Sequence, residues 1–293
     1  MAQHENHRDG LPAGDVVGQV KGQTSPDTKR DAQRRSGGVS GMDEGKPGGS
    51  AHEASQGEQM AFSGGASLSE EGAAAVRLPR VRQKLLAAEP LRVTLFGSST
   101  TEGVGASSPA TSYAGVFETC IRPYASGGLT VINRGIGGQG AAEMQARLPA
   151  VLADQPDLVI WQGGVNDPLT GVPLSRFEDM TRQDLQAICA TGADVALMDL
   201  QWCRLLDECP AAPAFQAAVH AMGQALHLPV FPRLARMHAW GKELGVGRED
   251  LSPDGVHMYD FGYRLLGQAV ADWVLTLAGI AQTRAIEPKV LPG

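Results

Sequence analysis

From residue 91 onward, short apolar runs alternate with longer stretches in which apolar residues recur every three or four positions. The apolar runs have the length of strands, and most of them end at a glycine or a proline. They are nearly continuous rather than alternating, which is typical of parallel strands covered on both faces. The expected strands are the runs LRVTLFG (91–97), LTVINRG (129–135), PDLVIWQGG (156–164), ADVALMDLQW (193–202) and LPVFPR (228–233).

The stretches between these runs have helical periodicity. Strands that alternate with helices predict right-handed βαβ units, and therefore a three-layer α/β/α sandwich around a parallel five-stranded sheet. Helices are expected over 113–124, 141–153, 174–191, 215–226 and 260–277. In the last helix, the side facing the core is expected to carry Leu265, Leu266, Ala269, Trp273 and Leu277.

Composition divides the chain unevenly. Residues 1–90 hold a single aromatic residue, Phe62, and are rich in small and polar residues, so most of this segment cannot bury enough apolar surface to offset chain entropy. Val81, Leu85 and Leu86 fall on one face of a short expected helix before the first strand. We therefore expect a disordered extension over 1–75, a helical lead-in over 76–90, one domain over 91–281 and a flexible tail over 282–293.

The formal net charge of −7 and the pI near 5.5 argue against a nucleic-acid-binding surface, which needs a clustered basic face. No apolar run is long enough to cross a bilayer, so no transmembrane segment is expected. The first twenty residues lack the basic-then-apolar pattern of a secretory signal, which makes a cytoplasmic location the expectation. The sequence names no partner for the N-terminal extension.

The cysteines give no indication of a metal or a cofactor. Cys120, Cys189, Cys203 and Cys209 are scattered, and the chain has no C-x-x-C pair. The spacing of the last two suits neither a common zinc site nor a redox pair. We therefore expect reduced thiols, no metal and no cofactor.

Polar residues that could carry chemistry follow the expected strands, where ligand sites form in open parallel sheets. The turn GSSTTEG follows the first strand, and a serine in a tight strand-to-helix turn can act as a nucleophile, although such turns are also common in ordinary loops. Asn166 follows the third strand, and its amide can donate to an oxyanion or serve only the turn. Asp254 and His257, three residues apart, can pair so that the imidazole acts as a general base.

Together these segments resemble the SGNH hydrolases, also called the GDSL esterase and lipase family, over residues 91–277. The first block of that family reads approximately FGDSxTxG and is FGSSTTEG here; the second is NRGIGGQG, the third GVND and the last DGVH. The resemblance implies a flavodoxin-like sheet, a catalytic triad of Ser99, Asp254 and His257, and an oxyanion hole formed by Ser99, Gly138 and Asn166. Each motif is short, but the four occur in the family's order.

Two positions depart from the family pattern. Ser98 replaces the aspartate that usually precedes the nucleophile, and Met258 stands where many members have proline. Since that aspartate is not a triad member, its loss is expected to alter the surroundings of the nucleophile rather than remove the chemistry.

The resemblance predicts a serine esterase that forms an acyl-enzyme. The small polar loops and the absence of an apolar lid between the blocks favour a short acyl group, such as acetyl, on a saccharide or polysaccharide. Trp161, Trp202 and Trp240 are candidates for lining a sugar cleft, or are core residues. Two alternatives stay open: an O-acyltransferase using the same serine, and a catalytically silent glycan-binding or assembly subunit.

Overall fold

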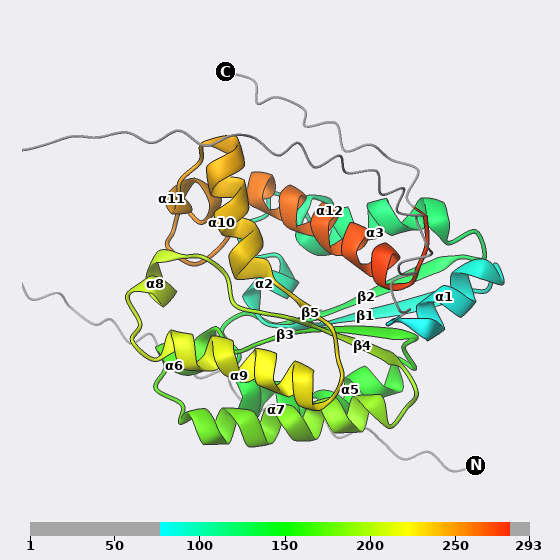
Figure 1. Ribbon diagram of the computed structural model, residues 1–293, viewed down its shortest axis with the longest axis horizontal. Helices are drawn as coiled ribbons and strands as arrows, with labels where there is room; N and C mark the ends of the chain where they lie inside the picture. The colour runs from blue at the N-terminus through cyan, green and yellow to red at the C-terminus, as the bar shows by residue number, and fades with distance from the viewer. Residues whose placement is uncertain (1–76, 282–293) are drawn as a thin grey trace, which may run out of the picture. The chain divides into compact units, whose positions relative to one another are not determined.

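The computed structural model describes residues 77–281, which contain a parallel sheet of five strands (Figure 1). The strand order is β2-β1-β3-β4-β5, the order of flavodoxin-like folds. The fold class predicted from the sequence is therefore confirmed. The strands are β1 (Leu91–Gly97), β2 (Leu129–Gly135), β3 (Leu158–Gln162), β4 (Asp194–Met198) and β5 (Val230–Phe231).

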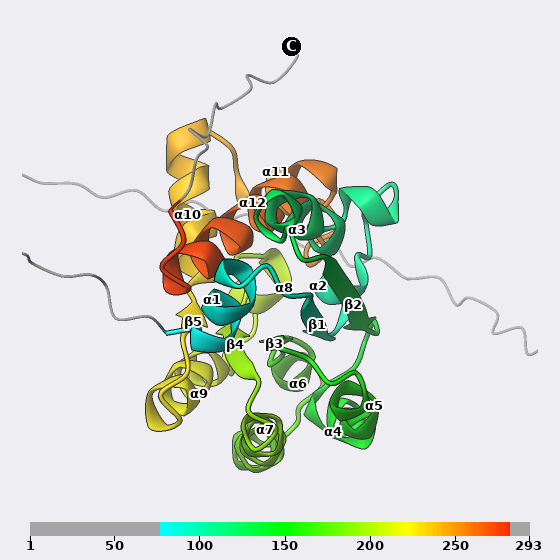
Figure 2. The ribbon, with the colours of Figure 1, turned by 90° about the vertical axis from the view of Figure 1, so that its right-hand side faces the viewer.

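Helices cover both faces of the sheet and complete the three layers (Figure 2). On one face lie α1 (Pro79–Leu86), α3 (Tyr113–Ile121), α10 (Arg233–Leu244) and α12 (Asp260–Leu277). On the other lie α4 (Ala141–Ala146), α5 (Leu148–Ala153), α7 (Leu174–Cys189) and α9 (Ala212–Ala225). Four short helices, α2 (Ser99–Glu102), α6 (Asn166–Leu169), α8 (Arg204–Asp207) and α11 (Arg248–Leu251), lie in the connections, as do the 3₁₀ turns η1 (Pro109–Thr111) and η2 (Arg122–Tyr124).

The burial of the strands explains their sequences. Every residue of β3 and β4 is buried, because each lies between two other strands and beneath helices on both faces. The edge strand β2 is only partly buried, and it accordingly includes the polar residues Thr130, Asn133 and Arg134. The other edge strand, β5, has two residues, since Pro232 follows it and has no N–H to extend the ladder.

Two expectations about helices need correction. The helix expected over 141–153 is two helices, because Arg147 adopts a non-helical φ of −107° just before Leu148 and Pro149 begin the second. The helix α10 was not predicted, although its buried residues Met237 and Trp240 have helical spacing. The apolar run at 228–233 indicates a strand, and the helix α10 starts directly after that strand.

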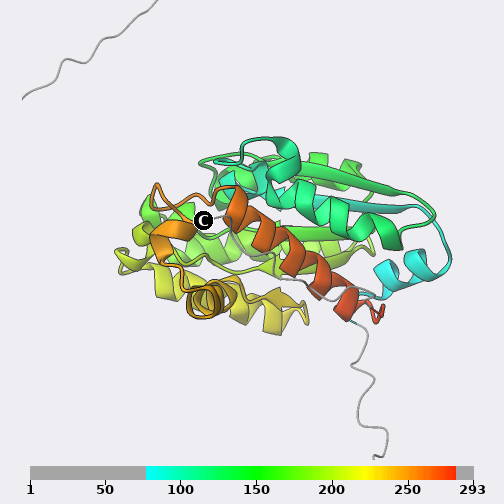
Figure 3. The ribbon, with the colours of Figure 1, turned by 90° about the horizontal axis from the view of Figure 1, so that it is seen from above.

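The face of α12 that enters the core is also different from the one expected. Leu266 is fully buried, but Leu265, Ala269, Trp273 and Leu277 are only partly buried at the edge of the core. The centre of the buried face consists of Tyr263, Leu266, Val270 and Val274. Gly267 lies against Val116, which allows α12 to lie along α3 (Figure 3). The small residue Gly267 marks this contact, and a search for large apolar residues misses it.

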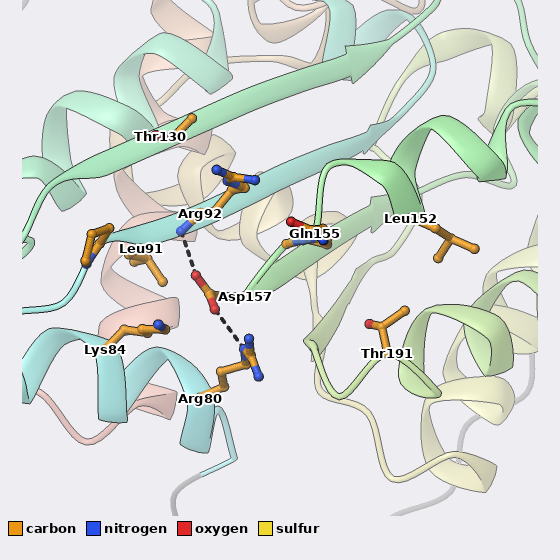
Figure 4. A pocket seen from close by; sticks show the side chains of 11 residues that line it. Arg80, Lys84, Leu91, Arg92, Thr130, Leu152, Gln155, Asp157 and Thr191 are labelled. Atoms are coloured by element: carbon orange, nitrogen blue, oxygen red, sulfur yellow. Dashed lines mark hydrogen bonds and ion pairs between the residues drawn. The ribbon is translucent and has the colours of Figure 1, made fainter.

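Helix α1 is fixed to the amino-terminal edge of the sheet by two aspartates (Figure 4). Asp157, just before β3, accepts a bond from Arg80 Nε at 2.8 Å and one from the backbone N–H of Arg92 at 2.9 Å. Asp194, at the start of β4, accepts the backbone N–H of Val81 at 2.9 Å and so caps the helix from a distance. Asp157, Arg80 and Arg92 line a cavity of about 610 Å³ at the edge opposite to the carboxyl ends of the strands.

A buried carboxyl on α7 predicts a pH-dependent stability. Asp184 is 2% exposed, its Oδ1 has no hydrogen-bond partner among the described residues, and burial raises its pKa to about 6. The raised pKa means that stability is lost as pH rises through the range from 3.8 to about 6. Asp184→Asn is therefore expected to raise the free energy of unfolding by about 2–3 kcal/mol at neutral pH, and much less near pH 3.

Urea unfolding at both pH values measures this difference. The control is Asp179→Asn, which changes an exposed carboxyl on the same helix and is expected to leave stability nearly unchanged. If Asp184→Asn does not stabilise the protein at neutral pH, Asp184 does not carry a buried charge.

Several sequence-based predictions lie wholly or largely outside the described residues. These are the disordered extension over 1–75 and the flexible tail over 282–293. Within the expected lead-in over 76–90, α1 is present and buries Val81 and Leu85, whereas Leu86 is 64% exposed. Among residues 77–281, no helix is long and apolar enough to cross a membrane.

Candidate active site

The candidate nucleophile lies where β1 ends and α2 begins. Ser99 is the first residue of α2 and is 7% exposed, so its hydroxyl lies in a recessed position at the carboxyl edge of the sheet. The turn is tight because two glycines leave room for it. A Cβ on Gly135 of β2 would lie 2.0 Å from the backbone nitrogen of Glu102, and one on Gly97 would lie 2.1 Å from Thr101 Oγ1.

Ser98, the residue that departs from the family pattern, faces the interior. It is 2% exposed, and its backbone N–H donates to Gln162 Oε1 at 3.2 Å. Gln162 Nε2 lies 3.3 Å from Ser98 Oγ, and Thr101 Oγ1 donates to Gln162 Oε1 at 2.9 Å. The Ser98 hydroxyl is therefore part of a buried amide–hydroxyl cluster at the end of β3.

The glycine-rich loop after β2 is held beside this turn by residues of the other motifs. Gly138 has a φ of +75°, a left-handed conformation that favours glycine. Asn166 Nδ2 donates to the carbonyl of Gln139 at 2.8 Å, and Asp167 Oδ1 accepts the N–H of Ala141 at 2.8 Å. Glu102 Oε2 accepts the N–H of Gly137 at 2.6 Å. The first three motifs therefore meet at this loop.

Asp254 and His257 form a hydrogen-bonded pair in the loop before α12. His257 Nδ1 lies 2.6 Å from Asp254 Oδ2, and Asp254 Oδ1 accepts the backbone N–H groups of Val256 and His257 at 2.9 Å and 2.6 Å. Partial burial acts to raise the pKa of Asp254, but the backbone bonds and the imidazole outweigh it and lower that pKa. Asp254 is thus an ionised acceptor that fixes one ring nitrogen and leaves Nε2 available.

Contacts between flanking residues bring the nucleophile turn and the histidine loop together. Tyr263 Oη, in the first turns of α12, donates to the carbonyl of Val104 at 2.6 Å. The backbone of Gly105 packs against the carbonyl of Met258 and the ring of Tyr259, so that a Cβ there would lie 2.5 Å from that carbonyl oxygen. Ser99 and His257 therefore belong to segments that touch at one edge of the sheet.

The tryptophans considered for a sugar cleft occupy other positions. Trp161 is 1% exposed and Trp240 is 6% exposed, so of the two alternatives both are core residues. Trp202 is partly exposed and stacks on His238 with ring centroids 4.4 Å apart.

An exposed apolar rim was missed from the sequence. Among the described residues, four of the large hydrophobic side chains with substantial exposure lie within five residues of a predicted site residue along the chain: Val104, Ile136, Leu169 and Tyr259. Tyr259 is 48% exposed and is two residues after His257. This proximity in sequence is the signal by which the rim could have been identified.

The described part of the chain contains no set of side chains that resembles a metal site. Residues 77–281 contain no group of three or more histidine, cysteine or acidic side chains able to hold a metal ion. His220, on α9, pairs with the buried Asp199, with Nε2 and Oδ2 2.8 Å apart. The four cysteines form no disulfide.

Solved structures that resemble this chain include esterases. A two-domain esterase active on acetylated mannans matches with a TM-score of 0.59 and 23% identity, covering 74% of this chain and 57% of that one. An acetylxylan esterase from Geobacillus stearothermophilus matches at 0.55 and 19%, covering 66% and 97%. A G-D-S-L family lipolytic protein from Desulfitobacterium hafniense DCB-2 matches at 0.51 and 20%, covering 62% and 98%. At these identities the likeness establishes the fold.

The strand order and the likeness to these structures place the chain in the same fold class as these proteins. Within that class, the profile of the Non-GDSL lipase-like family matches residues 67–280, which is more than half of the chain. The chain belongs to this family. No curated protein matches it in sequence.

Proposed function

We propose that the protein is a serine esterase that releases short acyl groups, acetyl in particular, from a carbohydrate. The observation that carries the proposal is the Asp254–His257 pair, in which a carboxylate held by two backbone N–H groups fixes the imidazole at the edge where Ser99 lies. An imidazole fixed by a carboxylate, on the same edge of the sheet as a recessed serine, is the kind of pair that can activate a hydroxyl for acyl transfer.

In the proposed reaction, His257 Nε2 takes the proton of the Ser99 hydroxyl while Ser99 Oγ attacks the ester carbonyl. The backbone N–H groups of Ser99 and Gly138 and the Asn166 amide stabilise the oxyanion. The tetrahedral intermediate collapses, and His257 returns the proton to the departing sugar oxygen. Water then attacks the acyl-enzyme with His257 again as the base, which releases the acid and restores Ser99.

The electrostatics and surface of the site support a neutral sugar ester. The Glu102 carboxylate is exposed next to the glycine loop, where it disfavours an anionic substrate. The exposed ring of Tyr259 offers an aromatic face of the kind on which sugar rings stack, and the other rim residues are apolar. The fold neighbours include esterases described as acting on acetylated mannans and as acetylxylan esterases, which is compatible with this choice.

Release of acetate and of octanoate from matched esters tests the proposal. The protein is expected to release acetate faster, because the connections around the site contain no apolar lid within the described residues to enclose a long chain. A clear octanoate preference would overturn the short-chain assignment. Absence of any release would favour the silent subunit, and transfer of acetate to an added sugar in place of water would identify an acyltransferase.

Tyr259→Ala is expected to raise KM for an acetylated oligosaccharide about three- to tenfold, through loss of an aromatic contact worth about 0.5–1.5 kcal/mol. KM for 4-nitrophenyl acetate should change little, because that substrate has no sugar to stack. Steady-state kinetics on both substrates measures the difference.

Two variants serve as controls for this result. Tyr259→Phe retains the ring and should behave like the wild type on both esters. Leu86→Ala changes an exposed apolar side chain on α1, away from the carboxyl edge. An equal change in KM for both esters would show that Tyr259 supports the loop rather than the sugar.

A further inference from the structure

One fully buried arginine is not used by the proposed reaction. Arg233 is the first residue of α10, directly after β5 and Pro232, and is 0% exposed. Burial lowers its pKa to about 10, while the charge of Asp199 acts against this shift, so the guanidinium remains a cation at neutral pH. Burying a charge costs free energy unless hydrogen bonds and nearby charges compensate for it, so the contacts of this side chain indicate its role.

The three nitrogens of the guanidinium donate to two segments of the carboxyl edge, the connection after β4 and the nucleophile turn. Nε donates to the carbonyl of Asp199 at 3.1 Å, directly after β4. Nη1 donates to Thr100 Oγ1 at 3.3 Å, and Nη2 donates to Gln201 Oε1. Thr100 is the residue after Ser99, so one branch of the guanidinium holds the nucleophile turn.

The second branch leads to the histidine loop through Gln201. This residue is 3% exposed, and its Nε2 donates to the carbonyl of Val256 at 2.8 Å. Val256 is bonded to His257 and also donates its own N–H to Asp254. A continuous hydrogen-bonded path therefore runs from Thr100 through Arg233 and Gln201 to the residue before His257.

The carboxylate of Asp199, whose charge acts on Arg233, forms its hydrogen bonds with other groups. Its Oδ1 accepts the N–H of Leu234 at 3.1 Å, and its Oδ2 contacts Gln216 and His220 at 2.7 Å and 2.8 Å. The guanidinium therefore bonds to neutral oxygens. A planar group with fixed donors suits this task, because it sets the relative position of the acceptors it joins.

We propose that Arg233 and Gln201 are positioning residues that fix the distance between Ser99 and His257. The inference rests on the proposed function, since it assigns the pair a role in that reaction. Neither residue touches the ester: Arg233 orients the nucleophile turn through Thr100, and Gln201 orients the histidine loop through Val256. Because small misplacements of reacting atoms are costly, loss of either link lowers turnover without weakening binding.

Gln201→Met tests the link without removing a charge. It is expected to lower kcat for 4-nitrophenyl acetate about 10- to 100-fold, with KM within about twofold of the wild type. Gln201→Glu retains an acceptor for Arg233 but lacks the N–H for Val256, so it should not rescue kcat. The matched control is Arg236→Met. Arg236 is an exposed arginine on α10, the helix that begins with Arg233, and this variant should retain full activity.

A double-mutant cycle identifies the path itself. Thr100→Val and Gln201→Met each break one end of the same connection, so the double variant should lose about as much kcat as the more affected single variant. Arg233→Met is expected to match that loss if it folds. Arg233→Lys should not rescue it, because one ammonium cannot hold three acceptors in the same fork geometry.

The outcomes separate this inference from the proposed function. If wild-type Ser99 reacts with a fluorophosphonate probe and folded Gln201→Met has wild-type kcat, the positioning role is wrong and the esterase proposal stands. Additive losses in the cycle, or a rise in KM with unchanged kcat, would also overturn the positioning role. If wild-type Ser99 does not react with the probe, the proposed function fails first.

Discussion

Ser99→Ala is expected to lower ester turnover at least about a thousandfold, because the acyl-enzyme cannot form without the hydroxyl. The variant should also lose covalent labelling by a fluorophosphonate, which reacts with the activated serine of the wild type. Ester hydrolysis and intact-mass measurement record the two effects. Retention of activity would remove Ser99 from the mechanism.

Ser98→Ala is the matched control, since it removes a neighbouring hydroxyl from the same turn. Ser98 Oγ is buried against Gln162, and its loss leaves the Thr101 bond to that amide in place. Turnover should fall far less than in Ser99→Ala. If the two variants lose activity equally, the turn as a whole, rather than one hydroxyl, is required.

Asp254→Asn is expected to lower kcat by about 10⁴-fold, the effect of removing the charge of a triad aspartate. The amide can still accept the backbone N–H groups of Val256 and His257, so the loop should keep its conformation. It lacks the charge that stabilises the imidazolium formed as Ser99 reacts. Steady-state kinetics with thermal unfolding as a check on folding measures this effect.

Asp250→Asn provides the comparison for this charge change. Asp250 accepts the N–H of Gly247 at 2.7 Å in the neighbouring helix α11, and its side chain has no part in the proposed reaction. Its variant should have near wild-type kcat. Because the pKa of Asp254 is lowered, the carboxylate stays ionised in mildly acidic solution, and the wild type should not lose activity there through its protonation.

The first two strands could be predicted closely from the sequence because their apolar runs end at glycine. β1 and β2 have the expected ends at Gly97 and Gly135. The edge strand β5 was harder to predict, because only Val230 and Phe231 of the run at 228–233 form a strand. Apolar runs mark burial, but pairing with a neighbouring strand depends on the tertiary fold.

The candidate site was predictable as a set of residues but not as a network. Ser99, Asn166 and His257 lie in recognisable sequence motifs, whereas Arg233 and Gln201 do not. Their position follows from how β4 and β5 end at the same edge, and a buried arginine is unexpected from composition because this residue is usually exposed. Sequence identified the chemistry better than the residues proposed to hold it in place.

The start and end of the described chain lie together at the amino-terminal edge of the sheet. The N–H of Arg77 donates to the carbonyl of Leu277 at 2.9 Å, where α12 ends after returning from the histidine loop. Within residues 77–281, both ends therefore lie away from the carboxyl edge, and an attachment made at either end of this part of the chain would not cover the turn that holds Ser99.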